Sequence, residues 1–165
     1  MNVLTINLLL STLTFWIAAR LYLMPRLPAL EPRAVLVPIL LLHATRHLGL
    51  MFLSPGAVYP GMPSTFAYPA AFGDLLAALL ALASLIALIR RRAITVVLLW
   101  IFNIEGSLDL VAAIVLATVY NADKVMGPAY WIPAVCVPAL LVTHAIVFVL
   151  LRRYRERIVP RREAS

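Results

Sequence analysis

Three side chains that can carry charge lie within an apolar part of the sequence, in the segment LHATRHLGL at residues 42–50. They are His43, Arg46 and His47. In an α-helix, the spacing i, i+3, i+4 places all three side chains on one face. An arginine at the centre of a membrane helix costs about 2.5–3.5 kcal/mol on insertion scales. If this helix crosses a membrane, Arg46 therefore requires a partner inside the protein.

A second group of polar residues lies in the segment WIFNIEGSLDL at residues 100–110, which is otherwise apolar. Glu105 and Asp109 are spaced i, i+4 and share a helix face. Asn103 lies on an adjacent face, and Gly106 allows a neighbouring helix to approach closely. We therefore expect this helix to lie at the centre of a helical bundle, where both polar faces are kept away from lipid.

The composition of the chain places these helices in a lipid bilayer. Of its 165 residues, 64% are hydrophobic and 13% are charged, against about 45–50% and 25% in typical globular proteins. Five apolar runs are each long enough to cross a hydrocarbon core of about 30 Å. They cover residues 3–24, 34–53, 69–89, 94–120 and 129–151. The sequence therefore predicts an all-α bundle of five transmembrane helices that forms one domain.

The basic residues that give the chain its net charge of +7 are concentrated in alternate connections. Three arginines lie around the first connection, three more form residues 90–92, and six lie in the tail at residues 152–165. By the positive-inside rule, this asymmetry predicts an external N-terminus and a cytoplasmic tail, as in a protein of the bacterial inner membrane. Because topology accounts for the arginines, we expect no nucleic-acid partner.

Prolines interrupt the helical pattern at two places. Residues 54–74 contain four prolines and four aromatic residues, and we expect them to form a non-helical outer loop. Asp74 ends this segment, where it would either cap the third span or join a polar site. Pro133 and Pro138 are expected to kink the fifth span.

The predicted depths of the polar residues suggest that four helices contribute to one site. With spans two and four running outward and spans three and five inward, eight polar side chains fall between mid-membrane and the outer face. These candidate ligand-binding residues are His43, Arg46, His47, Asp74, Asn103, Glu105, Asp109 and His144. An ion pair of Arg46 with Asp109 or Glu105 is expected within this set. Each residue has a structural explanation of its own, but intramembrane charges are functional by default.

Two segments of the chain resemble a known group of proteins. The pattern W-x-F-N-x-x-G-x-x-D-L at residues 100–110, together with PAVCVPALLVTH at residues 133–144, resembles an uncharacterised family of small multi-spanning bacterial inner-membrane proteins. The resemblance covers roughly the last three spans and implies no activity.

The predicted site favours a protein that binds or translocates a proton, a cation or a small polar solute. Its single arginine faces three carboxylates, and a bound proton or cation would offset their excess charge. A transition metal held by His43, His47 and Glu105 is a version of this hypothesis. The alternatives are a haem protein with His43 and His144 as axial ligands, and a membrane enzyme that acts on a lipid or isoprenoid through Glu105 or Asp109. An accessory subunit of an oligomer or larger membrane complex also remains open.

Overall fold

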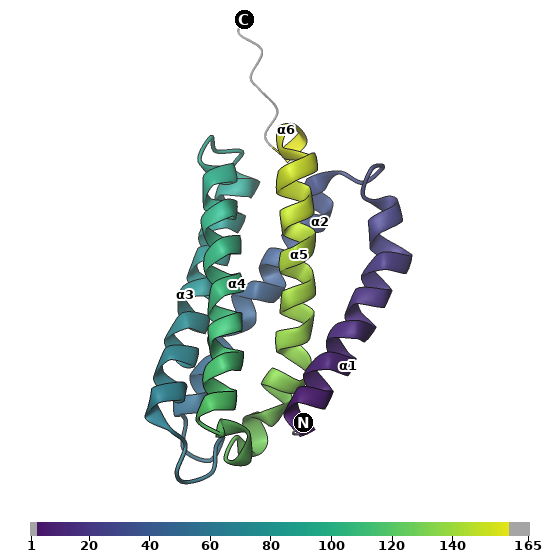
Figure 1. The fold of residues 1–165 in the computed structure, drawn as a ribbon. Helices are drawn as coiled ribbons and strands as arrows, with labels where there is room; N and C mark the ends of the chain where they lie inside the picture. The colour runs from purple at the N-terminus through teal and green to yellow at the C-terminus, as the bar shows by residue number, and fades with distance from the viewer. Residues whose placement is uncertain (1–2, 159–165) are drawn as a thin grey trace, which may run out of the picture.

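The computed structural model of the chain describes residues 3–158, and five long helices lie side by side within them (Figure 1). Each helix is long and apolar enough to cross a membrane. These candidate spans are Val3–Arg26, Pro32–Leu53, Ser64–Ile89, Thr95–Val119 and Gly127–Arg153. No strand is found in the described part of the chain, so the prediction of an all-α bundle with five spans is confirmed. The last part of the predicted tail, residues 159–165, lies outside the described residues.

The spans combine α-helix with shorter segments of other helical types. The α-helices are α1 (Val3–Ala18), α2 (Pro32–Ala44), α3 (Ser64–Ile89), α4 (Thr95–Val119), α5 (Val137–Arg153) and the short α6 (Arg155–Ile158). A π-helical segment, η1 (Ala19–Leu23), extends α1. A 3-10 segment, η3 (Thr45–Leu53), continues α2, and a second π-helical segment, η6 (Ile132–Cys136), leads into α5. The segment η3 contains Arg46 and His47, and η6 leads into the helix that contains His144. Irregular backbone therefore occurs in two spans that carry candidate site residues.

The third span begins at Ser64, five residues earlier than predicted, and includes Pro69 within the helix. The prediction that residues 54–74 are non-helical is therefore wrong for their second half. Pro69 is exposed near the start of the helix, where the loss of one N–H donor disturbs only the first turns. As a consequence, Asp74 lies well inside α3 and is buried, so it is not an N-terminal cap.

The second span changes from α-helix to 3-10 helix at Thr45, and this change alters which side chains share a face. From the last turn of α2 onward, the buried positions recur at every third residue and are His43, Arg46, Gly49 and Phe52. This period is expected of a 3-10 helix, which has three residues per turn. His47 is exposed, and its Nδ1 is 2.9 Å from the carbonyl oxygen of Ala44. The prediction that His47 shares a face with His43 and Arg46 is therefore wrong.

Two apolar layers enclose the level at which the polar residues lie. The larger layer, at the end of the bundle that carries the arginine-rich connections, includes Leu36, Leu40, Leu88, Leu99 and Leu150. The second layer, at the opposite end, includes Phe52, Phe66, Met126 and Ile132. Along the second, third and fourth spans, the polar positions fall between the residues of these two layers. The charged groups are thus held in the middle of the bundle.

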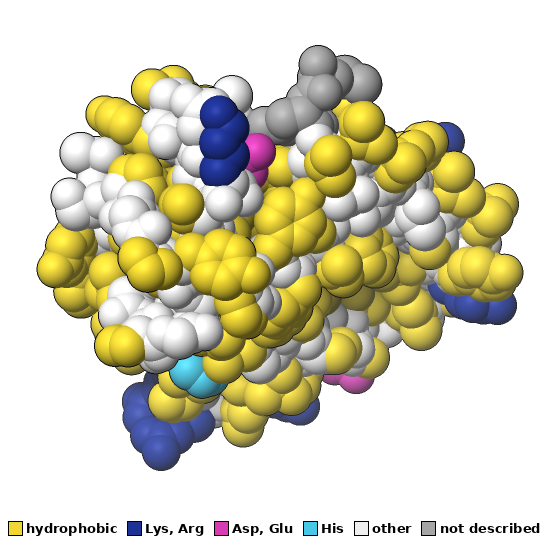
Figure 2. Space-filling model, turned by 90° about the horizontal axis from the view of Figure 1, so that it is seen from below, with side chains coloured by type: hydrophobic (Ala, Val, Ile, Leu, Met, Phe, Trp, Pro, Cys, Tyr) yellow, Lys and Arg dark blue, Asp and Glu magenta, His cyan; other side chains and the backbone are white. Residues whose placement is uncertain are grey.

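The outer surface of the bundle is apolar. Large hydrophobic side chains such as Leu9, Leu79, Leu108 and Val119 are exposed along the helices. In the view from below, the sides of the bundle are likewise mostly hydrophobic, with only a few charged side chains (Figure 2). A surface of this kind is unfavourable in water and favourable in lipid. Together with the five apolar helices, it indicates a multi-pass membrane protein.

Candidate functional site

The buried polar residues of the candidate site lie at one level of the bundle, between its two apolar layers. The guanidinium of Arg46 is at the centre of this level and connects three segments of the chain. Its Nε donates to Oδ1 of Asp74 on α3 at 2.7 Å, and its Nη2 donates to Oδ2 of Asp109 on α4 at 2.5 Å. Its Nη1 donates to the carbonyl oxygen of Gly106 at 3.2 Å. The expected partner Asp109 does bind Arg46, and Asp74 is a second partner that sequence reasoning did not pair with it. Both ion pairs are hydrogen-bonded, which is the form in which buried charges are tolerated.

Three glycines allow the helices to approach closely enough for these bonds. A Cβ atom at Gly106 would lie 2.7 Å from Nε2 of His144 and 2.8 Å from Nη1 of Arg46. A Cβ at Gly73 would lie 2.6 Å from Cγ of Asp109, and one at Gly49 would lie 2.7 Å from Cβ of Asp74. All of these distances are shorter than real Cβ contacts. Sequence reasoning identified Gly106 but missed Gly49 and Gly73; their position within three residues of a charged residue in an apolar span was the available signal.

His144 is held beside Arg46 by Asn103. The Nδ2 group of Asn103 donates to the carbonyl oxygen of His144 at 3.2 Å, so the amide oxygen of Asn103 is the atom that faces Nδ1 of His144 at 2.7 Å. Nδ1 must therefore carry a hydrogen and donate it. In the neutral ring, Nε2 is then an acceptor, and it lies 3.5 Å from Nη1 of Arg46. The Asn103 side chain thus orients the imidazole so that its lone pair faces the guanidinium.

His43 extends the polar chain toward Thr143 on α5. The Thr143 hydroxyl donates its single hydrogen to a backbone carbonyl one turn earlier, and the carbonyl oxygen of Leu140 lies 2.9 Å away. The hydroxyl oxygen therefore accepts a hydrogen bond from Nε2 of His43, also at 2.9 Å. Nδ1 of His43 is then a buried acceptor without a hydrogen-bond partner among the described residues. The rings of His43 and His144 lie side by side, with centroids 4.2 Å apart, and both pack against Phe102.

This geometry does not fit a haem or a transition metal bound by the predicted residues. Axial ligands lie on opposite sides of a macrocycle with the iron between them, whereas the rings of His43 and His144 are in direct contact at 4.2 Å. His47 is exposed and turned away, so it cannot bind a metal together with His43 and Glu105. Within residues 3–158, no group of three histidine, cysteine or carboxylate side chains is arranged to hold a metal ion.

Glu105 belongs to the same level, but its carboxylate forms no ion pair with the residues that the structure describes. It is half-buried and interacts electrostatically with Arg46 and Asp74. Its Oε2 atom is buried and has no hydrogen-bond partner in the described part of the chain. Seven of the eight predicted residues therefore lie together inside the bundle, and His47, which is exposed on its surface, is the exception.

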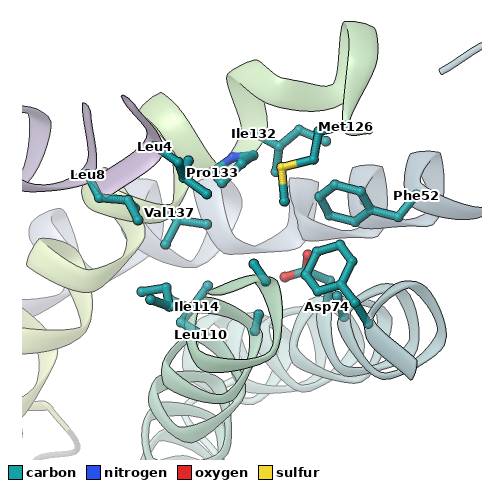
Figure 3. Close-up of a pocket in the computed structure, with 14 residues that line it drawn as sticks. Leu4, Leu8, Phe52, Asp74, Leu110, Ile114, Met126, Ile132, Pro133 and Val137 are labelled. Carbon is teal, nitrogen blue, oxygen red and sulfur yellow. The ribbon is translucent and has the colours of Figure 1, made fainter. Parts of the chain in front are cut away.

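Two cavities border the Asp74 side chain. The larger has a volume of about 240 Å³ and lies between η3 and the η6–α5 part of the fifth span, with Arg46 and Asp74 in its wall. The smaller has a volume of about 30 Å³. Figure 3 shows the Asp74 carboxylate pointing into this second cavity, where all the other lining side chains are apolar.

The fold and the site together define a polytopic helical membrane protein. Its spans enclose a charged cluster formed by Arg46, Asp74, Glu105 and Asp109. The chain belongs to the family described as Domain of unknown function (DUF8737), whose model matches residues 3–152. The match includes every residue of the cluster and fits the expectation of an uncharacterised family. No curated protein and no solved structure matches the chain.

Arg46→Met should strongly destabilise the protein, because it leaves Asp74 and Asp109 as unpaired buried charges. The expected loss is about 3–5 kcal/mol, as when one partner of a buried ion pair is removed. Adding Asp74→Asn and Asp109→Asn to the same chain should restore part of the stability, because the unpaired charges are removed as well. Thermal unfolding in lipid nanodiscs measures both effects, with Arg20→Met as an exposed control. A melting temperature for Arg46→Met equal to that of the wild type would contradict the central role of Arg46.

Gly106→Ala should destabilise the bundle by about 1–3 kcal/mol, the usual cost of an overpacked core. The added methyl group collides with His144 and Arg46, which are both held by other hydrogen bonds. The same unfolding measurement applies, with Ala112→Val on the exposed side of α4 as the control. Equal stability of Gly106→Ala and the wild type would show that the close approach at Gly106 is not required.

Proposed function

We propose that the protein is a membrane carrier or receptor whose charged cluster binds a cation, either a proton or the positive group of a small polar solute. The observation that carries this proposal is the imbalance between carboxylates and positive groups. One guanidinium is shared by Asp74 and Asp109, and the third carboxylate, Glu105, has a buried oxygen without a hydrogen-bond partner among residues 3–158.

An excess of negative charge inside a bilayer is costly, and a bound proton or cation offsets it. The accessible side chains of the cluster are its carboxylates and not its guanidinium. The side chains of Asp74 and Asp109 retain 12% and 13% of their exposed surface, whereas Arg46 retains 1%. A ligand that enters the site therefore meets negative charge first, which favours a cation over an anion.

The packing around the cluster supports a binding site and not an open channel. The layer toward the arginine-rich end is closed by apolar side chains, and Leu36, Leu40 and Leu99 within it are completely buried. A cation in the cluster would be released at that end only after the helices move apart. The proposed carrier cycle therefore requires a conformational change in this layer.

The distribution of arginines supports an orientation for the bundle. Exposed arginines flank the first and third connections and the end of α5, which lie together at the end of the bundle that carries α6 (Figure 1). We assign this end to the cytoplasm and the opposite end to the outside, in the inner membrane of a bacterium. In this orientation, the loop after η3 and the connection after α4 face outward.

Glu105→Gln should stabilise the protein at pH 8, because it removes a negative charge that the cluster does not compensate. For a chain of this length, a gain of about 1 kcal/mol raises the melting temperature by roughly 2–4 °C. The difference from the wild type should shrink toward pH 5, because the wild-type cluster then takes up the compensating proton. Melting temperatures in nanodiscs at both pH values measure this.

The matched control for this experiment is Glu31→Gln, which changes an exposed glutamate in the first connection. It should leave the melting temperature unchanged at both pH values. If Glu105→Gln has no effect at pH 8, or lowers the melting temperature there, the carboxylate is already compensated and the proposed cation site is wrong.

The orientation is tested by cysteine labelling in a Cys136→Ser background, which removes the chain's single native cysteine. A membrane-impermeant maleimide added to intact cells should modify Ser54→Cys and Lys124→Cys, which lie in exposed parts of the two outer connections. It should not modify Arg92→Cys in the third connection until the cells are opened. Labelling of Arg92→Cys in intact cells would reverse the proposed orientation.

A further inference from the structure

The larger cavity beside the cluster opens on the apolar outer surface of the bundle. It is bordered by η3 on one side and by η6 with the start of α5 on the other. Leu42, Leu48, Trp131 and Val135 line it and are also exposed on the outer surface of the bundle, so they form its rim. Because these residues belong to candidate membrane spans, a bilayer around the bundle would place hydrocarbon against the opening. A ligand that reaches the cavity through this opening comes from the bilayer and must tolerate an apolar environment.

The backbone on both sides of this cavity departs from the α-helix. η3 is a 3-10 segment and η6 is a π-helical segment, and both contribute residues to the lining. Irregular backbone is tolerated at membrane depth mainly where it is buried in protein or lines a cavity. π-Helical turns are also frequent at functional sites. The two irregular segments that line this cavity therefore favour its use as a binding site.

The inner wall of the cavity presents a hydrogen-bond acceptor with negative charge. Asp74 is nine-tenths buried, and Arg46 occupies only its Oδ1 atom. Oδ2 lies against Gly49, which also lines the cavity, and takes no hydrogen bond from the described residues. The donors of Arg46 are directed at Asp74, Asp109 and a backbone carbonyl, so the guanidinium does not offer a free positive charge to a ligand.

We propose that this cavity binds an amphipathic amine that enters from the bilayer, with its ammonium group on Asp74 and its apolar part between η3 and η6. This inference rests on the proposed cation site and names the class of its ligand. At about 240 Å³, the cavity is smaller than the roughly 300–1,000 Å³ of pockets for drug-sized ligands. It therefore accommodates the head group and the first part of an alkyl chain, and the rest of the chain remains in lipid.

Matched long-chain probes test the charge preference of the cavity. Dodecylamine, dodecanoic acid and dodecanol, each brominated near the head group, quench the fluorescence of Trp131 when they enter. Trp16→Phe and Trp100→Phe remove the other two tryptophans of the chain. The amine should quench in a saturable manner at a concentration about tenfold lower than the alcohol, which corresponds to one hydrogen bond to a charged group. The acid should be weaker than the alcohol, because its carboxylate faces Asp74.

Two variants locate the site of quenching. Asp74→Asn keeps the shape of the side chain and should abolish the preference for the amine. Ala139→Phe fills the cavity and should weaken saturable quenching by the amine, whereas Ala112→Phe, exposed on α4 away from the cavity, should have no effect. A melting curve of each variant shows whether it is folded, and Ala139→Phe keeps the test decisive if Asp74→Asn unfolds.

Equal quenching by the three probes, or stronger quenching by the acid, would overturn the proposal. Amine quenching that is unchanged by Ala139→Phe would do the same, since the amine would then lie in bulk lipid. If the amine preference is absent while Glu105→Gln still stabilises the protein at pH 8, the cation site stands and entry from the bilayer is wrong. If both effects are absent, the proposed function fails as well.

Discussion

The ion pairs of Arg46 with Asp74 and Asp109 are the interaction on which the rest of the bundle depends. A guanidinium and two carboxylates are each costly in hydrocarbon, and they are tolerated together only because their hydrogen bonds are short and shared. This requirement fixes the distance between η3, α3 and α4. It also explains the glycines at Gly73 and Gly106, since a methyl group at either position would occupy space that the charged side chains need.

The same interaction shapes the backbone of the second span. The 3-10 geometry of η3 directs Arg46 and Gly49 to the same side as His43, so that the guanidinium and the space for Asp74 lie next to each other. The other irregular segment, η6, lies across the larger cavity from η3. These two departures from the α-helix are thus found where the protein holds charge and free volume together, while α3 and α4 supply the carboxylates.

The histidines connect the charged cluster to α5. Asn103 orients His144 toward Arg46, and His144 in turn packs against His43. The buried Nδ1 atom of His43 lacks a hydrogen-bond partner in the described part of the chain. Such an unsatisfied group costs about 1–3 kcal/mol. In this bundle the unsatisfied atom lies beside the cluster, within a chain of polar groups that reaches from the carboxylates to Thr143.

The sequence by itself determined the five spans, because the length and apolarity of a membrane helix are local properties of the chain. It also predicted a common depth for the polar residues and an ion pair of Arg46 with Asp109 or Glu105, of which the structure contains the pair with Asp109. It could not determine the faces of the second span, because the choice between α and 3-10 geometry depends on the partners of Arg46 across the bundle. From the sequence, Asp74 is either a cap of the third span or part of the polar site, because prolines mark helix ends in sequence and yet are tolerated inside membrane helices. Only the tertiary structure decided that His43 and His144 are in direct contact and that a cavity lies beside Asp74 between η3 and η6, because both features depend on how helices distant in sequence pack together.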